Sequence, residues 1–340
     1  MTLDSLMRYP LPLVATLAAT FGIGAAQAAP PAVVTDIPVT HALVAQVMDG
    51  LATPELLLDR GGDAHHFQLR PSQARALSRA DLVVWVGPDL TPWLESTAET
   101  LGEGQALSLI MAEGTATQAY RPSRLLGDTA AEEQDDDHDH DHAHGGHGHD
   151  DHDHDHDEHH HDDAHEPGAI DPHAWLNPDN AAHWLSVIAE HLAALDPDNA
   201  ATYRENAEQA QARVAALADD LAEVLEPARD AGLVVYHDAY GYLAQRFDLN
   251  LLGAITLGDA AEPGAARLSA IRANLEQAGA ECLFPEVNHT DAHVELVTEG
   301  TSIRLGAALD PSGTAIEPGP ALYETLMRNL ARSIADCASG

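Results

Sequence analysis

Histidine is the residue type in this chain that most directly suggests chemistry, because a neutral imidazole is a good ligand for zinc, copper or nickel. Three histidines stand beside expected turns or strand ends. His65 follows a Gly-Gly-Asp turn, His173 lies in the segment Asp-Pro-His-Ala-Trp-Leu-Asn-Pro, and His237 comes directly after an apolar run. Ligands of open α/β sheets bind beyond the carboxyl ends of strands, where we expect His65 and His237. Spacing alone does not make these three residues a site, since a single histidine is more often structural.

A second group of histidines lies in a low-complexity segment over residues 132–166. It holds thirteen His and sixteen Asp or Glu with almost no apolar residue, so we expect a disordered insertion. The carboxylates concentrate cations and the imidazoles capture them, with modest affinity because nothing preorganises the ligands. A solvated loop without function is the alternative. The histidines expected to bind metal here are His138, His140, His142, His144, His147, His149, His152, His154, His156, His159, His160 and His161.

The composition excludes some classes of partner. The formal net charge is −39, and all sixteen basic residues are arginine. Such an acidic surface repels phosphate backbones, which argues against nucleic-acid binding. With 340 residues and 45% hydrophobic residues the chain is long and apolar enough for about two globular domains.

Residues 1–28 have the pattern of a secretory signal peptide. Arg8 precedes a mostly apolar run over 11–23, and Ala26-Gln27-Ala28 is a small-x-small site, so cleavage is expected after Ala28. The apolar run is shorter than the roughly 20 residues that a membrane-spanning helix needs. With no cysteine near the cleavage point to carry a lipid, we expect a soluble periplasmic or secreted protein that is not embedded in the membrane.

Only two cysteines are present, Cys282 and Cys337. In an exported protein such a pair indicates a disulfide rather than two free thiols. Closing a loop of about 55 residues would stabilise the fold by roughly 4 kcal/mol in the chain-entropy description, and would tie the C-terminal segment to a core strand. A thiolate metal site is the alternative, but zinc sites built on cysteine usually show close pairs.

The order of apolar runs predicts an α/β fold with mostly parallel sheets. Strands are expected in two series, first over 33–35, 55–58, 82–86 and 106–110, then over 233–236, 249–255, 282–284 and 302–305. Between the two series, residues 197–226 have the composition of one helix, which at 1.5 Å per residue would span about 45 Å. We therefore expect an N-terminal α/β domain over 29–195, a rigid linking helix over 196–227 and a C-terminal α/β domain over 228–340.

Six ordered motifs resemble those of the ZnuA-type periplasmic zinc-binding proteins of bacterial ABC importers. They are Tyr-His-Asp-Ala-Tyr-Gly-Tyr around His237, the context of His173, the Leu-Arg-Pro-Ser after His65, and the segments 82–88, 263–268 and 309–313. The resemblance covers nearly the whole mature chain, including the His/Asp-rich insertion and the two cysteines.

The resemblance implies a non-enzymatic protein that binds Zn²⁺ in the cleft between its two domains. His65 and His173 would come from the N-terminal domain and His237 from the C-terminal domain. Asp310 looks like the position that supplies a carboxylate in many relatives. Because Ala64 stands where some members have Glu, the fourth ligand is either Asp310 or water. Three imidazoles and a carboxylate suit tetrahedral Zn²⁺, whereas manganese-binding relatives favour more oxygen ligands.

The implied partner is an inner-membrane ABC permease and, through it, a cytoplasmic ATPase, with this chain acting as a monomer. The insertion would be a secondary zinc collector or a sensor. A periplasmic zinc buffer or adhesin-like protein, a manganese-specific relative and a zinc hydrolase are alternatives, but no clear general base for hydrolysis is present.

His289 and His293 have the i, i+4 spacing of a metal pair without the Glu of His-Glu-x-x-His proteases, and we expect both at the surface. His66 is expected to be exposed or to lie behind the ligands.

Overall fold

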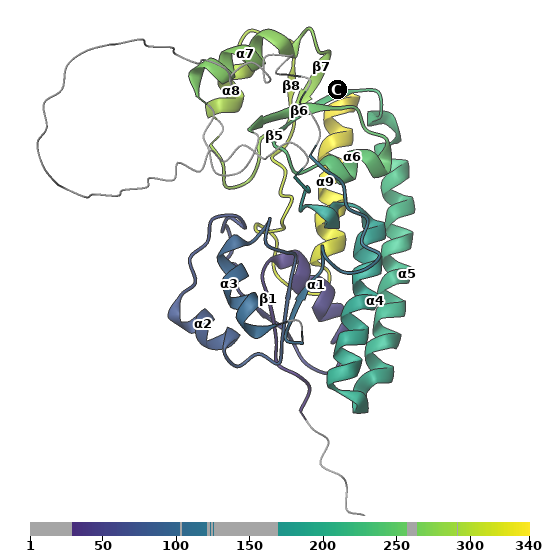
Figure 1. The fold of residues 1–340 in the computed structure, drawn as a ribbon. Helices are drawn as coiled ribbons and strands as arrows, with labels where there is room; N and C mark the ends of the chain where they lie inside the picture. The colour runs from purple at the N-terminus through teal and green to yellow at the C-terminus, as the bar shows by residue number, and fades with distance from the viewer. Residues whose placement is uncertain are drawn as a thin grey trace, which may run out of the picture.

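The computed structural model contains two parallel four-stranded sheets, one in each half of the chain (Figure 1). Both sheets place their first strand second from one edge, with the orders β2-β1-β3-β4 and β6-β5-β7-β8. The predicted series of strands is confirmed. The structure describes residues 29–102, 104–120, 123, 125, 169–256, 264–290 and 292–340, so the expected signal segment 1–28 and the insertion 132–166 lie outside the described residues.

The strands are short and buried at the centre of each sheet. In the first sheet they are β1 (Val33–Thr35), β2 (Glu55–Leu56), β3 (Leu82–Trp85) and β4 (Ala106–Ser108). In the second they are β5 (Gly232–His237), β6 (Leu251–Thr256), β7 (Ala280–Leu283) and β8 (Arg304–Leu305). Every residue of β1, β3 and β5, three of the four central strands, is buried, whereas β7 begins with the partly exposed Ala280 and the exposed Glu281. Full burial explains why β1, β3 and β5 are continuous apolar runs rather than alternating ones.

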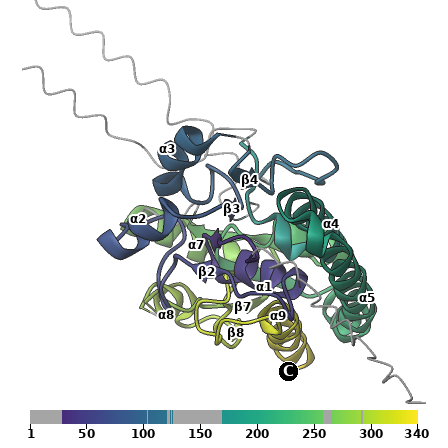
Figure 2. The ribbon, with the colours of Figure 1, turned by 90° about the horizontal axis from the view of Figure 1, so that it is seen from below.

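Helices cover the sheets and connect the two halves (Figure 2). Four of them, α1 to α4, begin with proline at the first helical turn, where the missing N–H costs nothing. The described helices are α1 (Pro38–Val47), α2 (Pro71–Leu77), α3 (Pro92–Leu101), α4 (Pro178–Leu195), α5 (Ala200–Leu225), α6 (Gly241–Phe247), α7 (Ala265–Leu275), α8 (Ala292–Thr298) and α9 (Leu322–Ser339).

The predicted linking helix is α5, and short 3₁₀ turns at Pro197–Asn199 and Glu226–Ala228 flank it. Its buried residues recur every three or four positions, as in Tyr203, Ala207, Ala210 and Val214, which makes one apolar stripe along the helix. Helices α4 and α9 lie alongside α5 (Figure 1). One continuous hydrophobic core therefore runs from β1 through these three helices to β5. The sequence predicted one helical connection, whereas the structure has three helices running beside each other.

The two cysteines form the predicted disulfide between Cys282 on β7 and Cys337 on α9. The bridge ties the C-terminal helix to the second sheet, as expected, while the same helix also contacts α1 of the first half. Among the described residues, no helix combines the length and the apolar character needed to cross a bilayer.

The buried His41 on α1 makes stability sensitive to acid. Burial lowers the pKa of its imidazole from the ordinary 6.5, although a hydrogen bond with the Pro54 carbonyl opposes the shift. The unfolded chain therefore binds a proton near pH 6.5, whereas the folded chain binds it only at lower pH, so the free energy of unfolding falls as pH drops through this range.

We expect urea denaturation of metal-free protein at several pH values to show a smaller loss of unfolding free energy toward low pH in His41→Gln than in the parent. A substitution at the partly exposed His191 is the control, and equal losses in the parent and His41→Gln would contradict the assignment.

Candidate metal centre

One pocket between the two halves is lined by all four ligands predicted from the sequence, His65, His173, His237 and Asp310. His237 is the last residue of β5, and His65 lies in the loop after β2. The remaining lining residues are Gly62, Asp63, Ala64, Glu286, Val287, Asn288, His289, Pro311, Ser312 and Thr314. His65 and His237 therefore lie beyond the ends of β2 and β5, where ligands of open α/β sheets were expected.

A buried carboxylate holds His237 in one orientation. Nδ1 of His237 lies 2.5 Å from Oε2 of Glu286, and the hydroxyl of Tyr240 donates to the same oxygen at 3.4 Å. Both His237 and Glu286 are buried. A carboxylate oxygen accepts hydrogen bonds, so this contact favours the tautomer of His237 with its proton on Nδ1 and with Nε2 facing the pocket.

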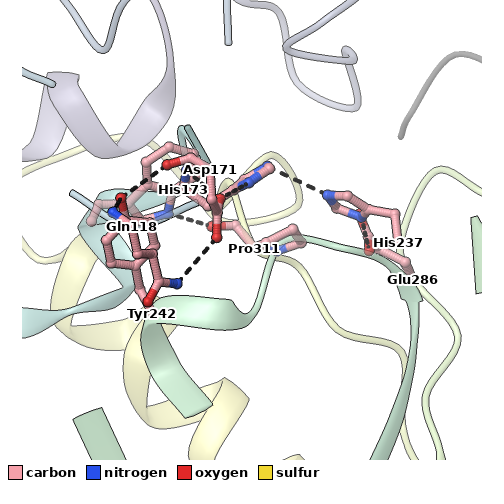
Figure 3. A network of polar contacts seen from close by, with 8 residues as sticks. Gln118, Asp171, His173, His237, Tyr242, Glu286 and Pro311 are labelled. Carbon is pink, nitrogen blue, oxygen red and sulfur yellow. Dashed lines mark hydrogen bonds and ion pairs between the residues drawn. The ribbon is translucent and has the colours of Figure 1, made fainter. Parts of the chain in front are cut away.

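His173 is held in the same way by a second carboxylate. Its Nδ1 donates to Oδ1 of Asp171 at 2.8 Å, and the backbone N–H of His173 donates to the same oxygen at 2.9 Å. Burial lowers the pKa of His173 while Asp171 acts in the opposite direction, so the imidazole is neutral, the form that binds metal. Figure 3 shows the two carboxylate and histidine pairs facing each other.

The two imidazoles meet through their Nε2 atoms, which are 3.5 Å apart. With both Nδ1 atoms facing carboxylates, both Nε2 atoms are placed to bind a cation. Two nitrogens bound at 2.0–2.1 Å to one tetrahedral Zn²⁺ would be about 3.3–3.4 Å apart. The observed separation therefore fits two ligands of one cation.

His65 supplies a third imidazole from the opposite loop. Oδ1 of Asp63 accepts the backbone N–H of His65 at 2.8 Å, and Trp93 donates its indole N–H to the carbonyl of Ala64 at 2.7 Å. The His65 ring lies 5.6 Å from that of His173, centroid to centroid. Across the described residues, no three His, Cys, Asp or Glu side chains are already arranged to hold an ion.

Asp310 lines the pocket with its carboxylate partly engaged. The backbone N–H groups of Thr314 and Ala315 donate to Oδ1 and Oδ2 at 3.0 and 2.9 Å. Burial raises the pKa of Asp310, and these backbone donors oppose the rise. Each carboxylate oxygen has two lone pairs, so the hydrogen bonds leave acceptor capacity for a metal. The geometry is compatible with Asp310 as a ligand and leaves water as the alternative.

The His173 segment is anchored by the second half of the molecule. The Tyr242 hydroxyl, on α6, donates to the Asp171 carbonyl at 3.0 Å and accepts the Gln118 N–H at 2.9 Å. The indole of Trp175 donates to the Pro311 carbonyl at 2.8 Å. Although His173 was predicted as a ligand of the N-terminal domain, these bonds join its loop to the C-terminal half (Figure 3).

Two further histidines, His66 and His289, lie near the candidate ligands in the sequence or in the structure. His66 is exposed, as expected. His289, which was expected at the surface, is 25% exposed and also lines the pocket. His289 lies in the turn before α8 rather than on one helix with His293. The sequence also missed the roles of Glu286 and Asp171, of which only Asp171 carried a signal, its position two residues before His173.

Replacing Glu286 tests the contribution of the carboxylate. In Glu286→Gln the amide oxygen can still accept the Nδ1 proton of His237, but the negative charge that strengthens the ligand is lost. We expect zinc affinity to fall about 10–100-fold, the usual effect of removing such a partner. Competition titration with a chromophoric chelator measures it, and Glu295→Gln on the exposed side of α8 is the control. Unchanged affinity in Glu286→Gln would exclude the role assigned to the carboxylate.

Gly241 at the start of α6 allows the close approach that anchors Asp171. A Cβ at this position would lie 2.6 Å from Nε2 of Gln118 and 2.9 Å from Oδ2 of Asp171. We expect Gly241→Ala to displace Asp171 and weaken zinc binding by about tenfold, because the displaced carboxylate no longer orients His173. Gly264→Ala is a matched control, since a Cβ at Gly264 meets no atom within 4 Å. Equal affinities of the two variants would contradict this account.

Comparison with known proteins identifies the family. A sequence model described as the zinc-uptake complex component A, periplasmic, matches residues 33–337. The high-affinity zinc uptake system protein ZnuA of Paracoccus denitrificans is 50% identical over 324 residues, covering 94% of this chain and 96% of the relative. The protein of that name from Brucella suis is 38% identical over 308 residues, covering 90% and 91%.

Solved structures agree on the fold. A crystal structure of ZnuA superimposes with a TM-score of 0.67 at 20% identity and covers 91% of this chain and 99% of its own. The solute-binding protein FpvC of Pseudomonas aeruginosa, in complex with Mn²⁺, gives a TM-score of 0.71 at 17% identity, with 91% and 99% covered. The match over 33–337 and the identity to the curated relatives show that this chain belongs to the ZnuA family of periplasmic zinc-uptake components.

Proposed function

We propose that this chain is a non-enzymatic zinc-binding protein that captures Zn²⁺ in the cleft and delivers it to an ABC permease for uptake. The observation that carries the proposal is the pair of Nε2 atoms of His173 and His237, 3.5 Å apart, with each ring fixed by a buried carboxylate. A binding protein needs ligands that are ready to accept the ion, and this pair is preorganised for it.

The ligand set of the proposal is His65, His173 and His237, with Asp310 or water completing the tetrahedron. Three imidazole nitrogens with at most one carboxylate favour Zn²⁺ over Mn²⁺, which prefers oxygen ligands. The relatives named as high-affinity zinc uptake proteins support the same metal. The titration below uses Mn²⁺ as the competitor for this reason.

The cellular setting follows from the family and from the sequence. Membership in a family of periplasmic components supports a periplasmic location. We propose that residues 1–28 are removed after Ala28 and that the mature chain works as a monomer. The permease would be driven by a cytoplasmic ATPase. The two halves of the chain act as domains over 29–195 and 228–340, joined by the helix over 196–227.

The His/Asp-rich insertion has a separate role in the proposal. Its histidines lie outside the described residues, and their number and spacing suit a weak collector that passes zinc to the cleft, or a sensor of zinc abundance. If the insertion were instead the working part, the protein would be a zinc buffer. A transport protein would have its tight zinc site in the cleft, whereas a zinc buffer would bind zinc in the insertion.

A titration separates these cases. We expect mature protein lacking residues 132–166 to bind one Zn²⁺ tightly in calorimetric competition, with Mn²⁺ unable to displace it, because the cleft ligands lie outside the deleted segment. His237→Ala in the same background removes one imidazole and should abolish tight binding. Only weak sites, all lost with the insertion, would overturn the cleft as the transport site and leave a zinc buffer.

A further inference from the structure

We infer that Glu286 and His289 form a second, weaker Zn²⁺ position at the solvent side of the pocket, through which the ion reaches the three histidines. The inference rests on the proposed function for the identity of the ion. It differs from that function in its ligands, since His289 belongs to neither the predicted set nor the motifs that carry the family resemblance.

A tight turn brings the two side chains together. The backbone N–H of His289 donates to the Glu286 carbonyl at 3.3 Å, so the two residues occupy the first and last positions of the turn. Asn288, at the third position, has a φ of 72°, a left-handed conformation that asparagine tolerates better than most residues. Nε2 of His289 thereby lies 4.0 Å from Oε1 of Glu286.

That separation suits a shared cation after a small adjustment. Nitrogen and oxygen donors at 2.0–2.2 Å from one Zn²⁺ are separated by about 3.4 Å in tetrahedral geometry. The two oxygens of Glu286 face different partners, because Oε2 accepts from His237 while Oε1 faces His289. One carboxylate is thus placed between a ligand of the deep site and the outer imidazole.

Neighbouring aromatic contacts hold the outer imidazole in place. The His289 ring stacks on Tyr236 with centroids 4.5 Å apart and planes inclined by 28°. The Tyr236 hydroxyl is hydrogen-bonded to Nδ1 of His293 at 3.1 Å, which fixes the tyrosine ring. A ligand whose orientation is set by its neighbours loses little freedom when it binds a metal.

The exposed fractions of the side chains indicate which of the two zinc positions lies nearer to solvent. The His289 side chain is 25% exposed, against 5% for His237 and 2% for His173. The rings of His289 and His237 are 6.4 Å apart, so the outer position adjoins the deep one. Glu286 is 7% exposed, so an incoming ion would meet His289 first and then pass along this buried carboxylate to the deeper imidazoles. Two protein ligands bind more weakly than three or four, which permits the transfer.

His289→Phe is the decisive variant, because phenylalanine keeps the stack on Tyr236 but offers no nitrogen. Crystals of the mature full chain grown with excess Zn²⁺ should give two anomalous difference peaks in the pocket, one at the deep histidines and one between Glu286 and His289. In His289→Phe the outer peak should be lost and the deep one retained. His191→Phe, changed on α4, should keep both.

A solution measurement accompanies the crystals. Stopped-flow transfer of zinc from a chelator should be slower for His289→Phe than for the parent, with the equilibrium affinity of the deep site unchanged. A parent crystal with only the deep peak, an outer peak that survives in His289→Phe, or equal transfer rates would each overturn the inference and leave the proposed function intact. Absence of the deep peak from the parent would instead overturn the proposed function.

Discussion

The candidate site depends on the two imidazole Nε2 atoms of His173 and His237, which face each other 3.5 Å apart. Left alone, two neutral histidines would rotate until one donated to the other or to water. Here each ring is fixed from behind by a buried carboxylate, Asp171 for His173 and Glu286 for His237. The fold therefore holds the two Nε2 atoms 3.5 Å apart, a separation that suits two ligands of one cation.

The fold maintains that approach because its two halves share one core. His173 and His237 are 64 residues apart in sequence, and an arrangement precise to tenths of an ångström requires a rigid connection. The continuous core through α4, α5 and α9 provides it, and the disulfide between Cys282 and Cys337 fixes the end of α9 to the second sheet. The hydroxyl of Tyr323, on α9, donates to the Trp175 carbonyl two residues after His173, which links this helix directly to the site.

The sequence predicted the parts of the fold that local pattern encodes. Apolar runs located the strands, and the uninterrupted helical composition before Pro227 located α5. The candidate ligands His65, His173 and His237 were found because they lie in recognisable motifs. Glu286 lies 49 residues from the histidine it contacts, and no local pattern encodes that distance. The i, i+4 spacing of His289 and His293 likewise does not reveal that His289 lines the pocket, because the chain turns sharply at Asn288 and His289 lies before α8.

Under the proposed function, the distribution of contacts around the pocket predicts which candidate ligand would leave first. His173 and His237 are each held by buried hydrogen bonds, and the His173 loop is tied to the C-terminal half by Tyr242. The loop that carries His65 meets the same half through an exposed Arg60 to Glu317 ion pair, a bond from Arg60 to the Ala315 carbonyl and a backbone bond from Gly61 to Thr314. Exposed pairs of this kind contribute only about 0–1 kcal/mol. Separation of the halves would therefore withdraw His65 while the other two imidazoles stay together, lowering the number of protein ligands without dismantling the site.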